Sequence, residues 1–186
     1  MKKDLGPKAS VYPMPVLMIG TYDSEGKVDV MNAAWGQTVG PDEIFLCLSD
    51  GHKTTKNLLE TKAFTVALAD AAHVREADFL GMASGNTMED KFERSGLTAE
   101  KSKRVNAPVI LEFPVTMECE LVKTTTYGLI GRVVNVIADA ECVDEKGRID
   151  AKKAGIILFD QFDSGYYLTG EKVGRAWNSG KELLAR

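Results

Sequence analysis

The segment that most constrains the fold is 115–122, where the sequence alternates with a period of two. Largely polar residues lie between the apolar positions Val115, Met117, Cys119 and Leu121. Because successive side chains of a β-strand point to opposite faces, this pattern predicts a strand with one buried face. The β-branched segment 126–138 predicts a second long strand, in which Gly128 and Gly131 mark a bend or bulge.

Shorter strand patterns recur along the rest of the chain. We expect strands at 16–22, 28–31, 44–48, 63–69, 140–143 and 166–168, with turns at 23–27 and 144–147. We expect helices at 71–82, 88–94 and 150–159, and another that ends at 60 and has Thr54 as its N-cap. Many short strands with few helices favour a mainly β fold with peripheral helices, closed or nearly closed into a barrel. The length favours a single domain over residues 1–186.

The charge balance argues against one broad class of function. A net charge of −4 is the opposite of the basic surface that a general nucleic-acid-binding protein normally carries. No apolar run approaches the ~20 residues needed to cross a bilayer, and the charged start lacks the apolar segment of a signal peptide. We therefore expect a cytoplasmic protein that binds neither nucleic acid nor membrane.

The three cysteines, Cys47, Cys119 and Cys142, are widely spaced and form no CxxC pair. This spacing argues against a thiol-redox motif or a zinc cluster, and two histidines are too few for a histidine-rich metal site. Free cysteine is among the most frequently buried residue types, so we expect all three to pack as small apolar side chains.

A candidate anion site spans 48–55, Leu-Ser-Asp-Gly-His-Lys-Thr-Thr, where a glycine-containing loop leads into a helix start. N–H groups at a helix N-terminus point toward an anion, and the helix dipole adds favourable charge. Lys53 supplies a cation, and His52, Thr54 and Thr55 supply hydrogen-bond donors. The alternative interpretation is that Thr54 only caps a surface helix and that Lys53 is solvated.

A second candidate is the strand end Asn32-Ala33-Ala34-Trp35. Its small side chains let the backbone approach a flat ring closely, and Trp35 can stack on or flank that ring. The alternative is an ordinary strand end with Trp35 packed in the core. A small strand end together with an anion-binding loop predicts a flavin mononucleotide (FMN) site.

A third candidate combines Ser84-Gly85-Asn86 with Asp90-Lys91-Phe92. Its alternative is a helix stop followed by a short amphipathic turn with a solvated Lys91. The chain contains neither a GxGxxG nor a Walker A pattern, which disfavours a Rossmann nicotinamide site and a P-loop.

Short motifs follow one another along most of the chain, from about residue 15 to residue 184. They are Pro15-Val16 with Gly20-Thr21, Asn32-Ala33-Ala34-Trp35, His52-Lys53-Thr54-Thr55-Lys56-Asn57, Ala63-Phe64-Thr65-Val66-Ala67, Ser84-Gly85, Asp90-Lys91-Phe92, Gly96-Leu97, Glu118-Cys119-Glu120-Leu121, Gly131-Arg132-Val133-Val134 and Tyr166-Tyr167-Leu168-Thr169-Gly170-Glu171-Lys172-Val173-Gly174. As an ordered set they resemble the flavin reductase-like, FMN-binding split-barrel family, and within it the flavoredoxin-type branch.

The resemblance implies that FMN lies in a groove of a six-stranded split barrel, usually at a dimer interface. It implies an isoalloxazine ring beside Asn32, Ala33, Ala34 and Trp35, with Leu48 and Ser49 reaching the ring or the ribityl chain. It implies a phosphate held by His52, Lys53 and Thr54 with Asn57 nearby, and a groove bordered by Gly85 and Lys91. Two departures concern the nicotinamide side. Val39-Gly40-Pro41-Asp42 stands where many relatives have Ser-Asp-Pro-Pro, and Arg132 replaces the usual acidic residue.

The function implied is an NAD(P)H-dependent flavin (FMN) reductase, in which NADH or NADPH transfers a hydride to flavin N5. The flavin carries the redox chemistry, so no side chain need act as a catalytic acid or base. Two alternatives stay open. One is a flavoredoxin-like electron-transfer protein that passes electrons from bound FMN to a redox protein partner, and the other is a non-catalytic FMN-binding protein. A homodimer is implied by the resemblance alone.

Overall fold

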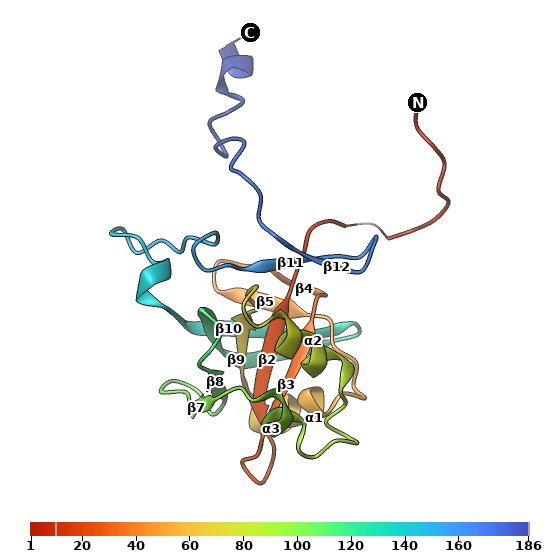
Figure 1. The fold of residues 1–186 in the computed structure, drawn as a ribbon, viewed down its shortest axis with the longest axis vertical. Coiled ribbons are helices and arrows are strands. Elements are labelled where there is room, and N and C mark those ends of the chain that lie inside the picture. Colours follow the sequence, from red (N-terminus) through yellow and green to blue (C-terminus); the bar gives the residue numbers. More distant parts are fainter. Residues whose placement is uncertain (10, 186) are drawn as a thin grey trace.

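The main feature of the fold is a curled sheet of seven strands (Figure 1), seen in a computed structural model that describes residues 1–9 and 11–185. The strand order is β3-β2-β6-β9-β10-β5-β4, with every neighbouring pair antiparallel. The strands are β2 (Leu17–Tyr22), β3 (Val28–Ala33), β4 (Gly36–Thr38), β5 (Glu43–Leu46), β6 (Ala63–Leu68), β9 (Val115–Thr125) and β10 (Gly128–Ala138). The mainly β fold is confirmed, and the short strand β4 makes the sheet one strand wider than the six expected.

The chain itself forces this sheet to curl. Strands β3 and β4 form opposite edges of the sheet, yet only Ala34 and Trp35 separate them in sequence. Three residue steps span at most about 11 Å, so the two edges must approach one another at this point. The sheet therefore curls into a barrel. Its edge strands β3 and β4 do not pair with one another, which leaves the barrel split, and the segment Ala34-Trp35 bridges the split.

The two longest strands, β9 and β10, behave as the alternation predicts. They pair along most of their length, and the register shifts between Ile130 and Gly131 and again between Val133 and Asn135. The bulge expected at Gly131 is thus confirmed. Such a bulge increases local twist and helps the sheet to curl.

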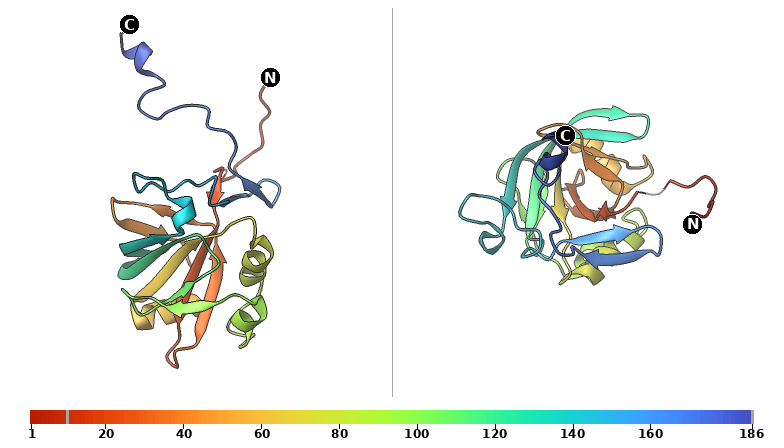
Figure 2. Two further views of the ribbon diagram at one scale, coloured as in Figure 1. Left: turned by 60° about the vertical axis from the view of Figure 1, so that its left-hand side comes forward. Right: turned by 90° about the horizontal axis from the view of Figure 1, so that it is seen from above.

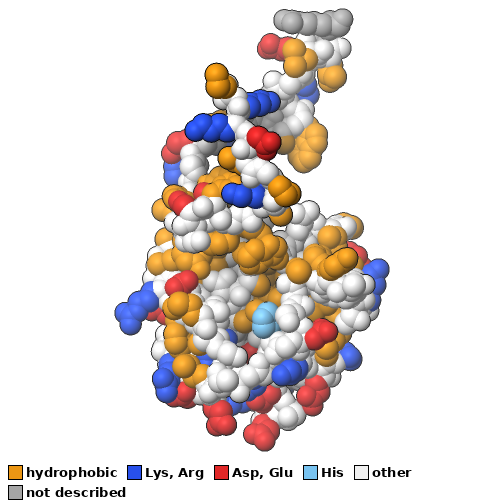
Figure 3. All heavy atoms as spheres, turned by 90° about the vertical axis from the view of Figure 1, so that its right-hand side faces the viewer, with side chains coloured by type: hydrophobic (Ala, Val, Ile, Leu, Met, Phe, Trp, Pro, Cys, Tyr) orange, Lys and Arg blue, Asp and Glu red, His pale blue; other side chains and the backbone are white. Residues whose placement is uncertain are grey.

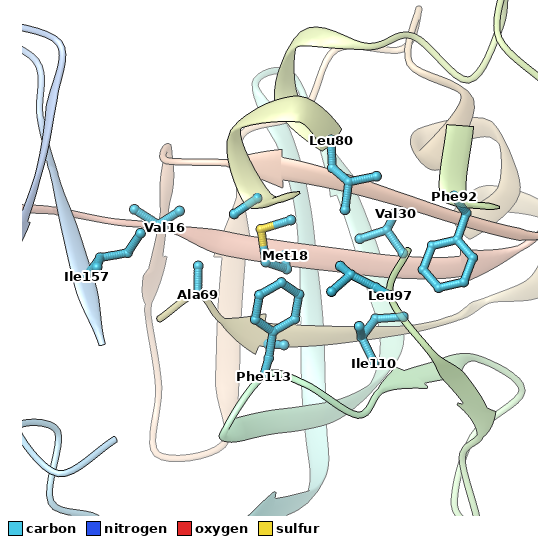
Figure 4. Packing of buried hydrophobic residues seen from close by; sticks show 12 residues of the cluster. Val16, Met18, Val30, Ala69, Leu80, Phe92, Leu97, Ile110, Phe113 and Ile157 are labelled. Carbon is cyan, nitrogen blue, oxygen red and sulfur yellow. The ribbon is translucent and has the colours of Figure 1, made fainter. Parts of the chain in front are cut away.

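Two hydrophobic clusters pack on opposite faces of the sheet. Leu17, Ile19, Phe64 and Cys119 belong to the cluster inside the barrel. Val16 and Met18 alternate with them and belong to the outer cluster, where Leu80 and Phe92 pack over the sheet (Figure 4). Since β2 is buried on both faces, its near-continuous apolar run has a direct structural cause.

In the part of the chain that the structure describes, three α-helices surround the sheet: α1 (Lys53–Thr61), α2 (Val74–Met82) and α3 (Lys91–Ser95). Helix α1 inserts Leu58 into the interior cluster, whereas α2 and α3 contribute to the outer one. Two 3₁₀ helices cover Ala140–Cys142 and Lys181–Ala185. Within the described residues, no helix combines the length and apolar character that crossing a bilayer requires.

A smaller sheet lies over one end of the barrel (Figure 2). It has the order β1-β11-β12 and joins β1 (Met14–Pro15) to the hairpin of β11 (Ile157–Asp160) and β12 (Gly165–Leu168). Strands β7 (Ala99–Lys101) and β8 (Pro108–Ile110) form a separate pair. Both terminal segments leave the barrel at the end that carries the β11–β12 hairpin.

Several local predictions are wrong. The expected strand at 140–143 is the 3₁₀ helix, and the expected helix at 150–159 consists of turns followed by β11. Strand β11 forms because it pairs with β12 and with β1, and β1 is a remote partner that a local pattern does not reveal. Helix α1 has His52 as its N-cap instead of Thr54, since the Thr54 hydroxyl is bonded to the buried Asp29. Cys119 and Cys142 are buried as expected, but Cys47 is exposed.

Candidate functional site

A groove of about 310 Å³, here called the main groove, opens where the barrel is split. Ala33, Ala34 and Trp35 form one wall of the groove, and Cys47 belongs to the neighbouring wall. The Cys47 N–H donates a hydrogen bond to the Trp35 carbonyl at 2.8 Å and so joins the two walls. The C-terminal part of α2 and the β11–β12 hairpin supply the remaining walls. Figure 3 shows one face of the molecule, with hydrophobic side chains around its centre and charged ones along its lower rim.

Aromatic side chains gather along the main groove. The Trp35 and Phe159 ring centroids lie 6.4 Å apart, and those of Phe159 and Tyr166 lie 6.0 Å apart. Trp35 is 57% exposed, so it is not the core residue that the alternative interpretation required. An exposed aromatic surface beside small residues suits a flat, partly apolar ligand.

The polar edge of the main groove is built from three elements. The Tyr166 hydroxyl on β12 donates to Asp78 Oδ1 on α2 at 2.9 Å. Burial, followed by the Asp78 hydrogen bond and charge, raises the pKa of Tyr166 to about 12. Tyr166 therefore stays a neutral hydroxyl at ordinary pH. Asn32 Nδ2 on β3 donates to the Ala77 carbonyl of α2 at 3.1 Å, which fastens the strand end to the helix.

A second space of about 180 Å³, here called the cationic hollow, adjoins the main groove. The two share the lining residues Met31, His52, Gly81 and Met82. Helix α1 begins at the cationic hollow, and its N-cap His52 makes no side-chain hydrogen bond to the first turn. The first N–H groups of a helix point outward along its axis, so this end of the hollow favours an anion.

Two lysines line the cationic hollow. Lys53 Nζ lies 3.2 Å from Asp23 Oδ2, and both side chains are partly exposed. Lys91 is only 4% exposed, and its Nζ lies 4.0 Å from Oδ1 of the buried Asp29. Burial lowers the pKa of the Lys91 ammonium, Asp29 opposes that effect, and Lys53 adds to it. Lys91 is thus not the solvated residue of the alternative interpretation.

Gly85 allows the close packing of the cationic hollow. A Cβ atom at this position would lie 2.4 Å from Asp29 Oδ1 and 3.0 Å from Lys53 Cδ. Real Cβ atoms do not approach other atoms so closely. Any residue other than glycine at position 85 would therefore force Asp29 or Lys53 to move. Gly81 is similar but less tight, because its Cβ would lie 3.1 Å from Asn32 Cβ.

The structure brings most of the predicted site residues together. Those on the main groove are Asn32, Ala33, Ala34, Trp35, Leu48 and His52. Those on the cationic hollow are His52, Lys53, Thr54, Gly85 and Lys91.

Ser49 and Asn57 line neither space. Ser49 Oγ accepts from the Gly51 N–H at 3.3 Å, within its own loop. Asn57 Nδ2 donates to Thr21 Oγ1 at 3.2 Å, in the buried interior. The Thr54 hydroxyl donates its proton to Asp29 Oδ2 at 2.5 Å and keeps only acceptor capacity toward the hollow.

Other lining residues were not predicted. On the main groove these are Met31, Cys47, Asp78, Gly81, Met82, Phe159 and Tyr166. Tyr166 belongs to the C-terminal motif, which was a usable signal. The α2 residues had none, because only the packing of that helix against β3 brings them to the groove.

A protein-family model described as the flavin reductase like domain matches residues 9–156. Among solved structures, the flavoredoxin of Desulfovibrio vulgaris (Miyazaki F) is similar with a TM-score of 0.92 and 33% identity, over 97% of this chain and 100% of that one.

Two more distant structures share the fold. A protein of Shewanella frigidimarina NCIMB 400, assigned as a flavin reductase with a split barrel domain, has a TM-score of 0.77 and 24% identity, over 88% of this chain and 85% of that one. An FMN-binding protein of Thermus thermophilus with bound 1-cyclohex-2-enone has a TM-score of 0.77 and 21% identity, over 94% of this chain and 98% of that one. The split-barrel fold expected from the sequence is confirmed.

Proposed function

This chain belongs to the flavin reductase-like domain family, and from that premise we propose that it is an FMN-binding oxidoreductase that uses NADH or NADPH as its reductant. The observation that carries the proposal is the junction of two unlike spaces. A partly apolar groove lined by aromatic side chains, of which Trp35 is exposed, shares lining residues with a hollow that has two lysines and a helix N-terminus. FMN has the same division into a flat ring and a phosphate.

The residues present fit that division. On the ring side, Ala33 and Ala34 offer backbone groups with little side-chain bulk, and Leu48 and Met82 offer apolar contact. On the phosphate side, Lys53, Lys91 and the first N–H groups of α1 supply charge and hydrogen-bond donors. Gly85 lets the backbone pack directly against Asp29 and Lys53, because a Cβ atom at this position would lie only 2.4 Å from Asp29 Oδ1.

Bound FMN would supply the redox chemistry by accepting a hydride from the nicotinamide at N5. The chain's own part is to bind and orient the cofactor. Asp78 and Tyr166 hold one another at the polar edge of the main groove, and the high pKa of Tyr166 keeps its proton in place. Trp35 leaves much of its surface open, which gives a second flat molecule room to approach.

The test is to mix purified protein, free FMN and NADH or NADPH under air and follow the nicotinamide absorbance. Consumption of either nicotinamide above the rate without protein supports the reductase. No turnover with both, in a protein that binds FMN, removes the reductase claim and leaves flavin binding intact.

A second candidate function is electron transfer without nicotinamide. The 33% identity to the D. vulgaris flavoredoxin, over nearly the whole of both chains, favours this candidate. If it is correct, photoreduced protein should pass electrons to a ferredoxin-like acceptor while showing no activity with NADH or NADPH. Slow reoxidation by every acceptor tried would instead favour a non-catalytic FMN-binding protein.

We also propose that the protein is a cytoplasmic homodimer. Apolar side chains are exposed along β9 and β10, among them Val122, Val134, Val136 and Ile137. A patch of this kind is typical of an interface with another protein chain. Light scattering after gel filtration should give twice the 20.3 kDa chain mass, and a monomer would contradict the proposal.

A further inference from the structure

A carboxylate lies beneath the cationic hollow, where an anion-binding site would be expected to avoid one. Asp29 is on β3 and is only 3% exposed. Its Oδ2 accepts the Thr54 hydroxyl, and its Oδ1 would touch any Cβ placed at Gly85. The negative charge therefore lies directly under the residues that would contact a phosphate.

The charges around the hollow almost cancel. Lys91 has Asp29 at 4.0 Å, and Lys53 has Asp23 at 3.2 Å. Asp23 is partly open to water, so its charge is screened, whereas Asp29 is surrounded by protein. Of the two carboxylates, Asp29 thus acts more strongly on an anion in the hollow.

We propose that Asp29 sets the charge of the phosphate-binding end of the site and so limits its affinity for FMN, making the flavin exchangeable instead of permanently held. This inference depends on the proposed function, because it takes FMN phosphate as the anion. Without the negative charge of Asp29, the positive charges of Lys53 and Lys91 are no longer almost cancelled. A phosphate in the hollow then binds more tightly.

The contrasting role for Asp29 is that of an anchor that holds Lys91 in position. A separation of 4.0 Å is too long for a hydrogen bond, so Asp29 acts on Lys91 through charge and not through a fixed contact. The hydroxyl of Thr54 does make a direct contact with Asp29, and an asparagine can accept that same bond.

The test is the substitution Asp29→Asn, which keeps the shape and the acceptor for Thr54. Dissociation constants for FMN and riboflavin are measured by flavin fluorescence in wild type and variant. We expect FMN to bind about tenfold more tightly to D29N, as one buried unit charge implies, and riboflavin, which lacks the phosphate, to bind equally. The matched control Asp23→Asn makes the same charge change at a partly exposed position and should change FMN affinity by less than about threefold.

Equal or weaker FMN binding by D29N would overturn the inference, and so would a parallel change in riboflavin binding. If wild-type protein binds neither flavin, the proposed function itself fails. One measurement needs no variant: wild-type affinity for FMN should fall by less than about threefold between 50 and 500 mM NaCl, because a near-neutral site has little charge to screen. A steep fall would show a strongly cationic site and contradict the role of Asp29.

Discussion

Replacing Lys91 with methionine should lower both the stability of the protein and its affinity for FMN. Lys91 is 4% exposed and is the cation next to the buried Asp29. Methionine keeps most of the length of the side chain and removes the charge. Asp29 then keeps its hydrogen bond from Thr54 but loses its counter-ion.

The size of the stability change follows from the burial of the pair. Removing one partner of a buried ion pair costs about 3–5 kcal/mol. Because the Lys91–Asp29 separation is 4.0 Å and the Thr54 hydroxyl remains, the lower end of that range, about 3 kcal/mol, applies. For a chain of this length, the melting temperature of the flavin-free protein should fall by about 6–12 °C.

Lys53→Met is the matched control. The side chains of Lys53 and Asp23 are 22% and 18% exposed, and a pair open to solvent contributes at most about 1 kcal/mol. Its melting temperature should therefore fall by less than about 4 °C. Each variant loses one charge-assisted contact to the phosphate, worth about 1.5–3 kcal/mol, or a 10–150-fold loss of FMN affinity.

Calorimetry of the flavin-free proteins and fluorescence titration with FMN measure the two effects separately. Equal melting temperatures for K91M and wild type would refute the argument from the buried pair. Unchanged FMN affinity in both lysine variants would show that the phosphate does not occupy the cationic hollow.

Three further predictions concern the same site. Burial lowers the pKa of Lys91 from the ordinary 10.5, so its ammonium is deprotonated at a lower pH than an ordinary lysine. As the pH rises through this pKa, the affinity for FMN should fall, whereas K91M should show no such fall. FMN titrations at successive pH values would record the difference. Gly85→Ala places a Cβ 2.4 Å from Asp29 Oδ1 and should weaken FMN at least tenfold, by roughly the cost of one lost contact, whereas Gly170→Ala, which meets nothing within 4 Å, should not. Cys47 is exposed on the main groove, so iodoacetamide should label it and FMN should protect it, as mass spectrometry would show.

Much of the sheet could be predicted because its signal is local. The alternation at 115–122 and the glycines of the next strand depend only on neighbouring residues, and both gave the correct element. Strand β11 could not be found this way, because it exists through pairing with β1 and β12, and β1 is more than a hundred residues away. The interpretation of 150–159 as a helix failed for that reason.

The candidate site divides in the same manner. The Asn32–Trp35 segment and the loop before α1 are continuous motifs, and they do lie on one groove. Asp78 and Tyr166 are 88 residues apart and meet only after folding. Asp29 gave no signal at all, since an aspartate in a short strand is ordinarily solvated, and only the covering residues Thr54, Gly85 and Lys91 bury it.

Titration of the purified protein with FMN, followed by flavin fluorescence and visible absorption, tests the central claim most directly. The account predicts saturable binding of one FMN per chain, with weaker binding of riboflavin and protection of the Cys47 thiol. A colourless protein whose addition leaves the spectrum and fluorescence of FMN unchanged would contradict it.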